Sequence, residues 1–135
     1  MSLKVLICDV DHRFVERATR FLGRHGHQVL NEPLVDEVYD VARRWRPDVL
    51  VLASEAVHTA DGGLLRRVSQ LPHRPAILLT GQLDRFDAAW RAWRQGGDEL
   101  LLKPILHAWE LHTAIVSAIE CAAPKATGSS AAASA

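Results

Sequence analysis

Apolar residues gather in five short runs along the chain, separated by segments in which they recur at helical spacing. The runs lie at residues 3–8, 28–31, 48–53, 76–80 and 99–103. Three of them are apolar almost without alternation, which is typical of strands that helices cover on both faces. The repeated alternation of strand and helix predicts an α/β fold, a doubly wound five-stranded parallel sheet with five helices.

The segments between the strands each place their apolar residues on one helical face. Gly26 stands where the first helix should end, and Gly96 and Gly97 should stop the fourth. Residues 1–121 are therefore expected to form one domain. Residues 122–135 are rich in Ala and Ser without periodicity, which predicts a disordered tail or the stump of a linker.

The composition excludes several functional classes. Lys plus Arg and Asp plus Glu both number 16 in the 135 residues, so no net charge favours nucleic acid or a membrane surface as a partner. The two cysteines are too few and too far apart for a disulfide framework or a thiolate metal site. The sequence shows neither a membrane-spanning stretch nor a signal peptide. We expect a cytoplasmic protein.

The ends of the predicted strands carry the candidate chemistry, because ligands of such sheets bind beyond the carboxyl ends of the strands. The first run ends in VLICDVD, the third contains RPDVLVL, and the fourth reads PAILLTG. The most specific element is GGDELLLKPI, which places Lys103 and Pro104 after an apolar strand that follows a Gly-rich helix stop. Over residues 3–121 this pattern resembles the receiver domains of bacterial two-component response regulators, the CheY-like superfamily.

The resemblance implies a flavodoxin-like sheet with strand order 2-1-3-4-5. In receivers, a histidine kinase supplies a phosphoryl group to an aspartate at the end of the third strand. An acidic pair at the end of the first strand holds a divalent cation. The position of Lys103 matches the lysine that contacts the phosphorylated aspartate, and the bond to the following proline is usually cis.

This sequence departs from the receiver pattern at its chemical centre. Ala53 occupies the phosphoacceptor position, and Val10 occupies the second acidic position. The methyl group of Ala53 cannot form an acyl phosphate. Val10 stands where receivers have a carboxylate that binds the metal, so we expect Mg²⁺ binding to be weak or absent. Asp9 and Lys103 are then expected to neutralise each other without metal. We therefore predict no enzymatic activity and no cofactor.

The other positions of the receiver phosphorylation pocket can be identified in this sequence, although the phosphoacceptor aspartate is missing. These are Asp9, Val10, Thr80, Lys103 and Pro104. Thr80 matches the switch hydroxyl, whereas Leu100 stands where an aromatic switch residue is usual. Glu55 follows Ala53 by two residues, so its side chain need not point into the pocket.

Asp11 and Val10 also have a local explanation. Asp11 is placed to cap the first helix through the backbone N–H of Arg13 or Phe14. Val10 and Val15 have the spacing of a hydrophobic staple. These roles are structural and do not require Asp11 to bind metal.

Aromatic and arginine side chains mark a candidate interaction surface. In the family, the fourth helix, fifth strand and fifth helix contact partners or a second copy. The matching residues here are Trp90, Arg91, Trp93, Arg94, Leu100 and Trp109. Trp90 also fits the apolar stripe of its helix, whereas the spacing predicts that Trp93 and Trp109 are exposed. Tryptophan and arginine are enriched at interface hot spots.

These features favour a phosphorylation-independent pseudo-receiver that binds a signalling protein or itself. The alternative is an active receiver that accepts a phosphoryl group on a non-standard acid. A small-molecule-binding flavodoxin-like module is a third class, but the segment DVDHRF (9–14) lacks the phosphate-cradling residues that such a module needs. With only a tail expected after residue 121, we predict no output domain in this chain.

Overall fold

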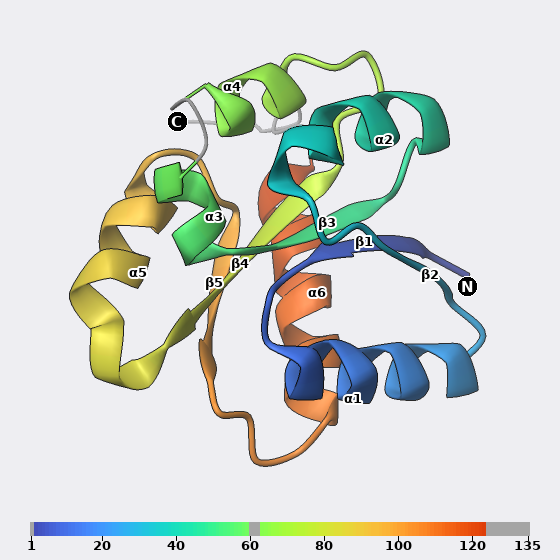
Figure 1. The fold of residues 1–135 in the computed structure, drawn as a ribbon. Helices are drawn as coiled ribbons and strands as arrows, with labels where there is room; N and C mark the ends of the chain where they lie inside the picture. The colour runs from blue at the N-terminus through green and yellow to red at the C-terminus, as the bar shows by residue number, and fades with distance from the viewer. Residues whose placement is uncertain (1, 60–62, 124–135) are drawn as a thin grey trace, which may run out of the picture.

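The fold is described from a computed structural model, in which residues 2–59 and 63–123 are described. Five parallel strands form one sheet in the order β2-β1-β3-β4-β5 (Figure 1). The strands are β1 (Lys4–Cys8), β2 (Gln28–Asn31), β3 (Val49–Ala53), β4 (Ala76–Gln82) and β5 (Glu99–Lys103). The predicted sheet and its strand order are confirmed.

Six α-helices accompany the sheet in the described residues, one more than the sequence predicted. They are α1 (His12–Arg24), α2 (Val38–Trp45), α3 (Ser54–Thr59), α4 (Leu64–Ser69), α5 (Phe86–Arg94) and α6 (Trp109–Ala122). Two 3₁₀ turns, Val35–Glu37 and Leu83–Arg85, precede α2 and α5. The prediction missed the short helix α3. This helix is stabilised by tertiary packing, since its residue Val57 is buried against the core. The predicted tail lies outside the described residues from residue 124 onward.

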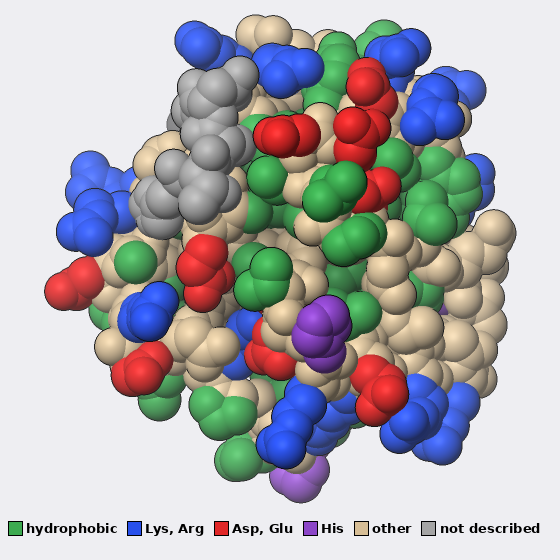
Figure 2. Space-filling model, in the orientation of Figure 1, with side chains coloured by type: hydrophobic (Ala, Val, Ile, Leu, Met, Phe, Trp, Pro, Cys, Tyr) green, Lys and Arg blue, Asp and Glu red, His purple; other side chains and the backbone are tan. Residues whose placement is uncertain are grey.

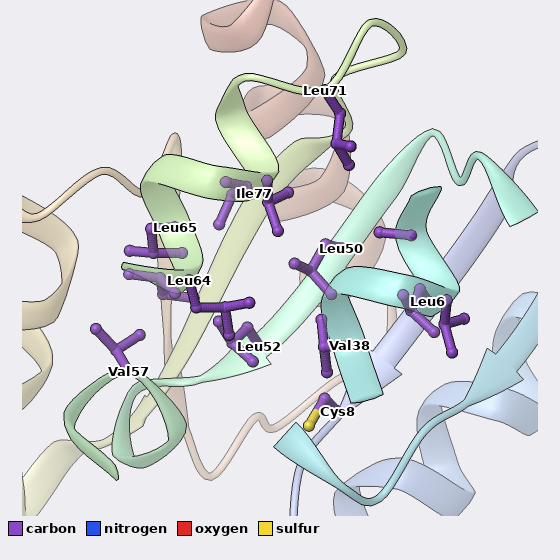
Figure 3. Close-up of a cluster of buried hydrophobic side chains, with 14 of the residues drawn as sticks. Leu6, Cys8, Val38, Leu50, Leu52, Val57, Leu64, Leu65, Leu71 and Ile77 are labelled. Atoms are coloured by element: carbon purple, nitrogen blue, oxygen red, sulfur yellow. The ribbon is translucent and has the colours of Figure 1, made fainter. Parts of the chain in front are cut away.

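Strand residues alternate between two hydrophobic clusters, one on each face of the sheet. Leu6, Leu50 and Leu52 pack on the face covered by α2, α3, α4 and α5, whereas Val5 and Val51 pack on the face covered by α1 and α6. Figure 3 shows the first cluster, with side chains of the strands and of α2, α3 and α4 turned toward one another. Every residue of β3 is buried. This two-sided burial explains why the apolar runs show little alternation in sequence.

Glycines fix the ends of two helices. Gly26 has a φ of 82° just after α1, and the N–H of His27 donates to the Leu22 carbonyl over 3.0 Å, as the sequence predicted for a helix stop. Gly96 has a φ of 147° after α5. At the neighbouring Gly97, an added Cβ would lie 2.7 Å from a methyl carbon of Leu79, so a larger residue would not fit.

The topology brings the segments that follow the strands to one edge of the sheet, since all five strands are parallel. Asp9, Ala53 and Lys103, which follow or end three different strands, are collected there. Among residues 2–59 and 63–123, no helix combines the length and apolar character needed to cross a bilayer.

Candidate functional site

Asp9 lies immediately after β1 and is the centre of a buried polar cluster. One carboxylate oxygen, Oδ2, accepts hydrogen bonds from Thr80 Oγ1 and from Lys103 Nζ, each over 2.9 Å. The other, Oδ1, accepts from the backbone N–H of Asp11 over 2.9 Å. The side chain is only 1% exposed. Both oxygens are therefore held by donors of the protein itself.

Lys103 ends β5 and supplies the positive charge of this cluster. Its side chain is 5% exposed, and its Nζ forms a second, longer ion pair with Asp11 Oδ2 at 3.4 Å. The ammonium also lies 4.9 Å from the centre of the Phe14 ring, a cation–π distance. The predicted neutralisation of Asp9 by Lys103 is present, and the contact with Asp11 is an addition that the sequence reasoning missed.

Asp11 caps α1, as the sequence predicted. Its Oδ1 accepts from the backbone N–H of Phe14 over 3.2 Å. Burial pushes the pKa of this carboxyl upward, but the bond from Phe14 and the charge of Lys103 outweigh it, so the pKa lies below its ordinary value. Asp11 thus serves the helix and the ion cluster at once.

The predicted hydrophobic staple between Val10 and Val15 is not supported. Val10 is 77% exposed, so most of its surface meets solvent and little of it packs against the helix. The carboxylates on either side hold the backbone in place, since the N–H of Asp11 donates to Asp9. Val10 is therefore positioned by its neighbours and not by its own packing.

Ala53 ends β3 and stands opposite Thr80 in the ladder between β3 and β4. It is 3% exposed and places a methyl group at the position that the resemblance to receivers assigns to the phosphoacceptor. A small cavity of about 170 Å³ adjoins it. Glu55 lines the same cavity, although the sequence gave no reason to expect it there.

Cys8 also lines this cavity but contributes no reactive group. Burial, followed by the negative charges of Asp9 and Glu32, raises the pKa of its thiol to about 11. At neutral pH the sulfur is therefore protonated, and a protonated thiol is neither a good nucleophile nor a good metal ligand.

The residues of this edge do not fit a Mg²⁺ ion. Mg²⁺ prefers an octahedral set of oxygen ligands and is usually held through carboxylates. Val10 and Ala53 offer no side-chain oxygen, and the carboxylate of Asp9 is already occupied by an ammonium. Across residues 2–59 and 63–123, no group of three or more His, Cys, Asp or Glu side chains could hold a metal ion.

The residues at the switch positions are fixed by packing and hydrogen bonding. Thr80 is fully buried, and its hydroxyl donates to Asp9. At the next residue, Gly81, an added Cβ would lie 2.5 Å from the Cβ of Ala89, so α5 packs directly on β4. Leu100 is half-buried and packs on the cluster beneath α2 to α5. The Lys103–Pro104 bond is cis, as the resemblance implied.

Tryptophans of the expected interaction surface are arranged differently from the prediction. Trp90, which fitted the core stripe, is 42% exposed and stacks on Phe86 with 6.0 Å between ring centroids. Trp93, expected to be exposed, is half-buried in the core cluster and meets Trp90 edge-on at 5.1 Å. The sequence spacing did not decide which of the two faces the sheet. Trp109 is 62% exposed, as predicted, and Arg91 and Arg94 are exposed as well.

Exposed apolar side chains also occur on the segments that follow four of the five strands, a feature that sequence reasoning missed. Val10, Leu34, Leu83 and Leu106 are between 62% and 78% exposed. We call these four residues the apolar rim. Arg17 holds one part of it in place, because its guanidinium donates to the carbonyls of Ile105 and Leu106 over 2.7 and 2.9 Å. The signal in the sequence was a large apolar residue in each of these turns.

Comparisons with known proteins agree on the fold. A response regulator receiver domain protein from Clostridium thermocellum superposes on this chain with a TM-score of 0.71 at 22% identity. The superposition covers 87% of this chain and 94% of that protein. The chain has the receiver fold. A response regulator from Burkholderia pseudomallei, solved with a phosphorylated aspartic acid, calcium and citrate, gives a TM-score of 0.70 at 21% identity over 87% of this chain and 69% of that one.

Sequence comparison gives a weaker result. Protein PilH from Pseudomonas aeruginosa is 28% identical over 107 residues, which cover 76% of this chain and 86% of PilH. No protein-family model matches the sequence. The fold is therefore better supported than any assignment to a particular set of receivers.

Breaking the ion pair at Lys103 tests its structural role. Lys103→Met should lower the free energy of unfolding by about 3–5 kcal/mol, because it leaves the carboxylate of Asp9 buried without a cation. The double variant Asp9→Asn with Lys103→Met should lose less than the two single variants combined, and urea denaturation of all three measures the coupling. Arg43→Met, which removes an exposed pair with Asp40, is the control and should change stability by less than about 0.5 kcal/mol. A Lys103→Met protein as stable as the wild type would contradict this role.

Asp11 should make stability depend on pH. Because its pKa is lower in the folded protein, its charge stabilises the fold above the ordinary value of 3.8, and this stabilisation is lost as the pH falls through the folded value. Asp11→Asn keeps a capping side chain, so its deficit against the wild type should shrink at low pH. Asp11→Ala should lose about 0.5–2 kcal/mol more, since it also removes the cap. Denaturation curves at several pH values measure both effects, and an Asp11→Asn deficit that did not change with pH would exclude the charge effect.

Proposed function

We propose that this chain is a phosphorylation-independent pseudo-receiver, which acts by binding a signalling protein or a second copy of itself in bacterial two-component signalling. One observation supports it most: the buried carboxylate of Asp9 is neutralised by Lys103, while Ala53 stands at the acceptor position. A receiver with this arrangement has neither a group to phosphorylate at the end of β3 nor an open carboxylate for a cation. Its signal then comes from binding, abundance or location.

Electrostatics favour the joint loss of the phosphoacceptor and of the metal-binding acid. Several carboxylates in one pocket raise one another's pKa and need a cation to remain charged. Asp9 alone can be balanced by Lys103, with Asp11 nearby as a partly exposed second acid. The replacements at Val10 and Ala53 therefore leave a pocket whose buried charges are paired without a metal ion.

Exposed apolar and aromatic residues support the binding part of the proposal. Trp90 and Trp109 lie on α5 and α6, and the apolar rim lies on the turns beyond the strands. Large exposed apolar side chains that gather on one side of a protein are typical of interaction sites. On the face seen in Figure 2, hydrophobic side chains reach the surface between separate acidic and basic groups. We propose the surface of α5, β5 and α6, with the rim residues Leu83 and Leu106 that follow β4 and β5, as the contact region.

The competing hypothesis is an active receiver that uses another acid. Glu55 is its best candidate, because it lines the cavity beside Ala53. Its side chain is two residues beyond the acceptor position and belongs to α3. The next experiment separates the two hypotheses.

Amide NMR spectra with Mg²⁺ and then beryllofluoride, which mimics a phosphoryl group, test the loss of chemistry. The wild type should show no saturable shifts at residues 9, 53, 80 and 103. The variant Val10→Asp with Ala53→Asp should bind Mg²⁺ and then beryllofluoride, because it restores oxygen ligands and an acceptor. Val10→Asp with Ala53→Asn is the matched control and should not take up beryllofluoride. Saturable beryllofluoride shifts in the wild type that disappear in Glu55→Gln would overturn the proposal in favour of the active receiver.

Photo-crosslinking in the native host tests the binding surface. A benzoylphenylalanine at position 109 or 106 should form a discrete adduct, and the same group at exposed Arg43 of α2 should not form it. An adduct of twice the chain mass would identify self-association, and a different mass would identify another protein. The adduct should form equally in Ala53→Asn, since no phosphorylation is involved. The proposed surface would be contradicted if neither position 109 nor position 106 gave an adduct, or if position 43 gave the same adduct.

A further inference from the structure

A groove of about 760 Å³ lies at the opposite edge of the sheet from Asp9, where the strands begin. It runs between α6 and the segments around the end of α1, near the N-terminal end of β1 in Figure 1. Its volume falls within the range of about 300–1,000 Å³ that is typical of small-molecule sites. Nothing in the receiver chemistry at the other edge accounts for it.

The groove has an apolar wall. Leu3 directly precedes β1, Ala76 begins β4, and three more residues come from α6: Val116, Ile119 and Ala122. Val116 is 38% exposed although it is a large aliphatic residue. The wall offers a surface against which the apolar body of a ligand could be buried.

Three histidines gather along the same groove, and His27 offers it a hydrogen-bond donor. His27 Nδ1 accepts from the backbone N–H of Leu3 over 3.0 Å, so its proton lies on Nε2 when the ring is neutral. His25 Nδ1 donates to the carbonyl of Phe21 over 2.9 Å. His112 joins them from α6. These side chains come from three different segments, so only the fold brings them together.

The charges around the groove favour a negative ligand at the histidines. The pKa of His27 is lowered by burial and then by the positive charges of His112, the amino terminus and His25. A ligand anion would relieve this repulsion. Of the other charged groups that line the groove, Arg74 is paired with Asp98 at 3.1 Å, and Asp48 accepts from the N–H of Lys4 over 2.8 Å. Glu120 is the lining acid that should oppose an anion.

We propose that this groove binds a small organic anion. Its apolar body would lie against Val116 and Ile119, and its carboxylate or equivalent head would accept hydrogen bonds from Nε2 of His27 and from His112. The site is independent of phosphorylation and lies at the edge of the sheet away from Ala53.

An NMR titration of the full chain with 2-naphthoate tests this inference, and 2-naphthylmethanol serves as the uncharged control with the same ring body. Naphthoate should shift amides of residues 3, 27, 76 and 116 saturably and bind about tenfold more tightly than the alcohol, which corresponds to about 1.4 kcal/mol. Its affinity should rise as the pH falls below the ordinary histidine value of 6.5, because the pKa of His27 lies below that value and the ring gains its charge only there. Equal affinity for the two probes would overturn the anionic head.

Matched variants locate the site. Val116→Phe should fill the groove and weaken naphthoate binding at least about tenfold, whereas Cys121→Phe, at an exposed position of α6 outside the lining, should not. His112→Ala should weaken binding, and Glu120→Gln should strengthen it. Shifts that do not saturate, or that persist in Val116→Phe, would overturn the proposal. If Val116→Phe instead moved amides of residues 124–135 in the absence of probe, that segment would be the occupant and the proposal would be wrong.

Discussion

The buried ion pair between Asp9 and Lys103 is the constraint on which the carboxyl edge of the sheet depends. The two residues follow or end strands that are not neighbours in the sheet, and Thr80 joins them from a third strand. A charged group with 1–5% exposure is stable only when its partner is present and its remaining hydrogen-bonding atoms are satisfied. No described buried side-chain nitrogen or oxygen is left without a partner. The ion pair therefore fixes the ends of β1, β4 and β5 relative to one another.

The same pair shows how the receiver fold accommodates Val10 and Ala53 at this edge of the sheet. A pocket of three acids would leave excess negative charge beside Lys103 and would require a cation. Replacement of two acids by Val10 and Ala53 removes that requirement, and the hydrophobic clusters on both faces of the sheet need no change. Fold and phosphoryl chemistry thus depend on different residues, as is general for folds that host several functions.

Much of this architecture could be predicted from the sequence because it depends on local periodicity and chain order. The strands, the stop at Gly26 and the cap at Asp11 all follow from short patterns, whereas the pairing of Asp9 with Lys103 was expected from the resemblance to receivers. Other features depend on contacts between distant segments. The helix α3 is stabilised by burial of Val57, and the spacing of Trp90 and Trp93 did not decide which one faces the sheet. The histidine groove needs the packing of α1, β2 and α6, which no single stretch of sequence reveals.

Val10 connects the proposed loss of phosphoryl chemistry with the proposed binding function. Substitution of an acid by a polar, uncharged residue would have been sufficient to weaken a metal site. Valine in addition places an apolar side chain, 77% exposed, beside the pocket in which Lys103 is paired with Asp9. Single exposed apolar residues are ordinary on protein surfaces, but Val10 occurs with Leu34, Leu83 and Leu106 on the turns of the same edge. Covering this rim in a complex would bury apolar surface at about 25 cal/mol per Å², which gives a physical reason for the edge to bind a partner.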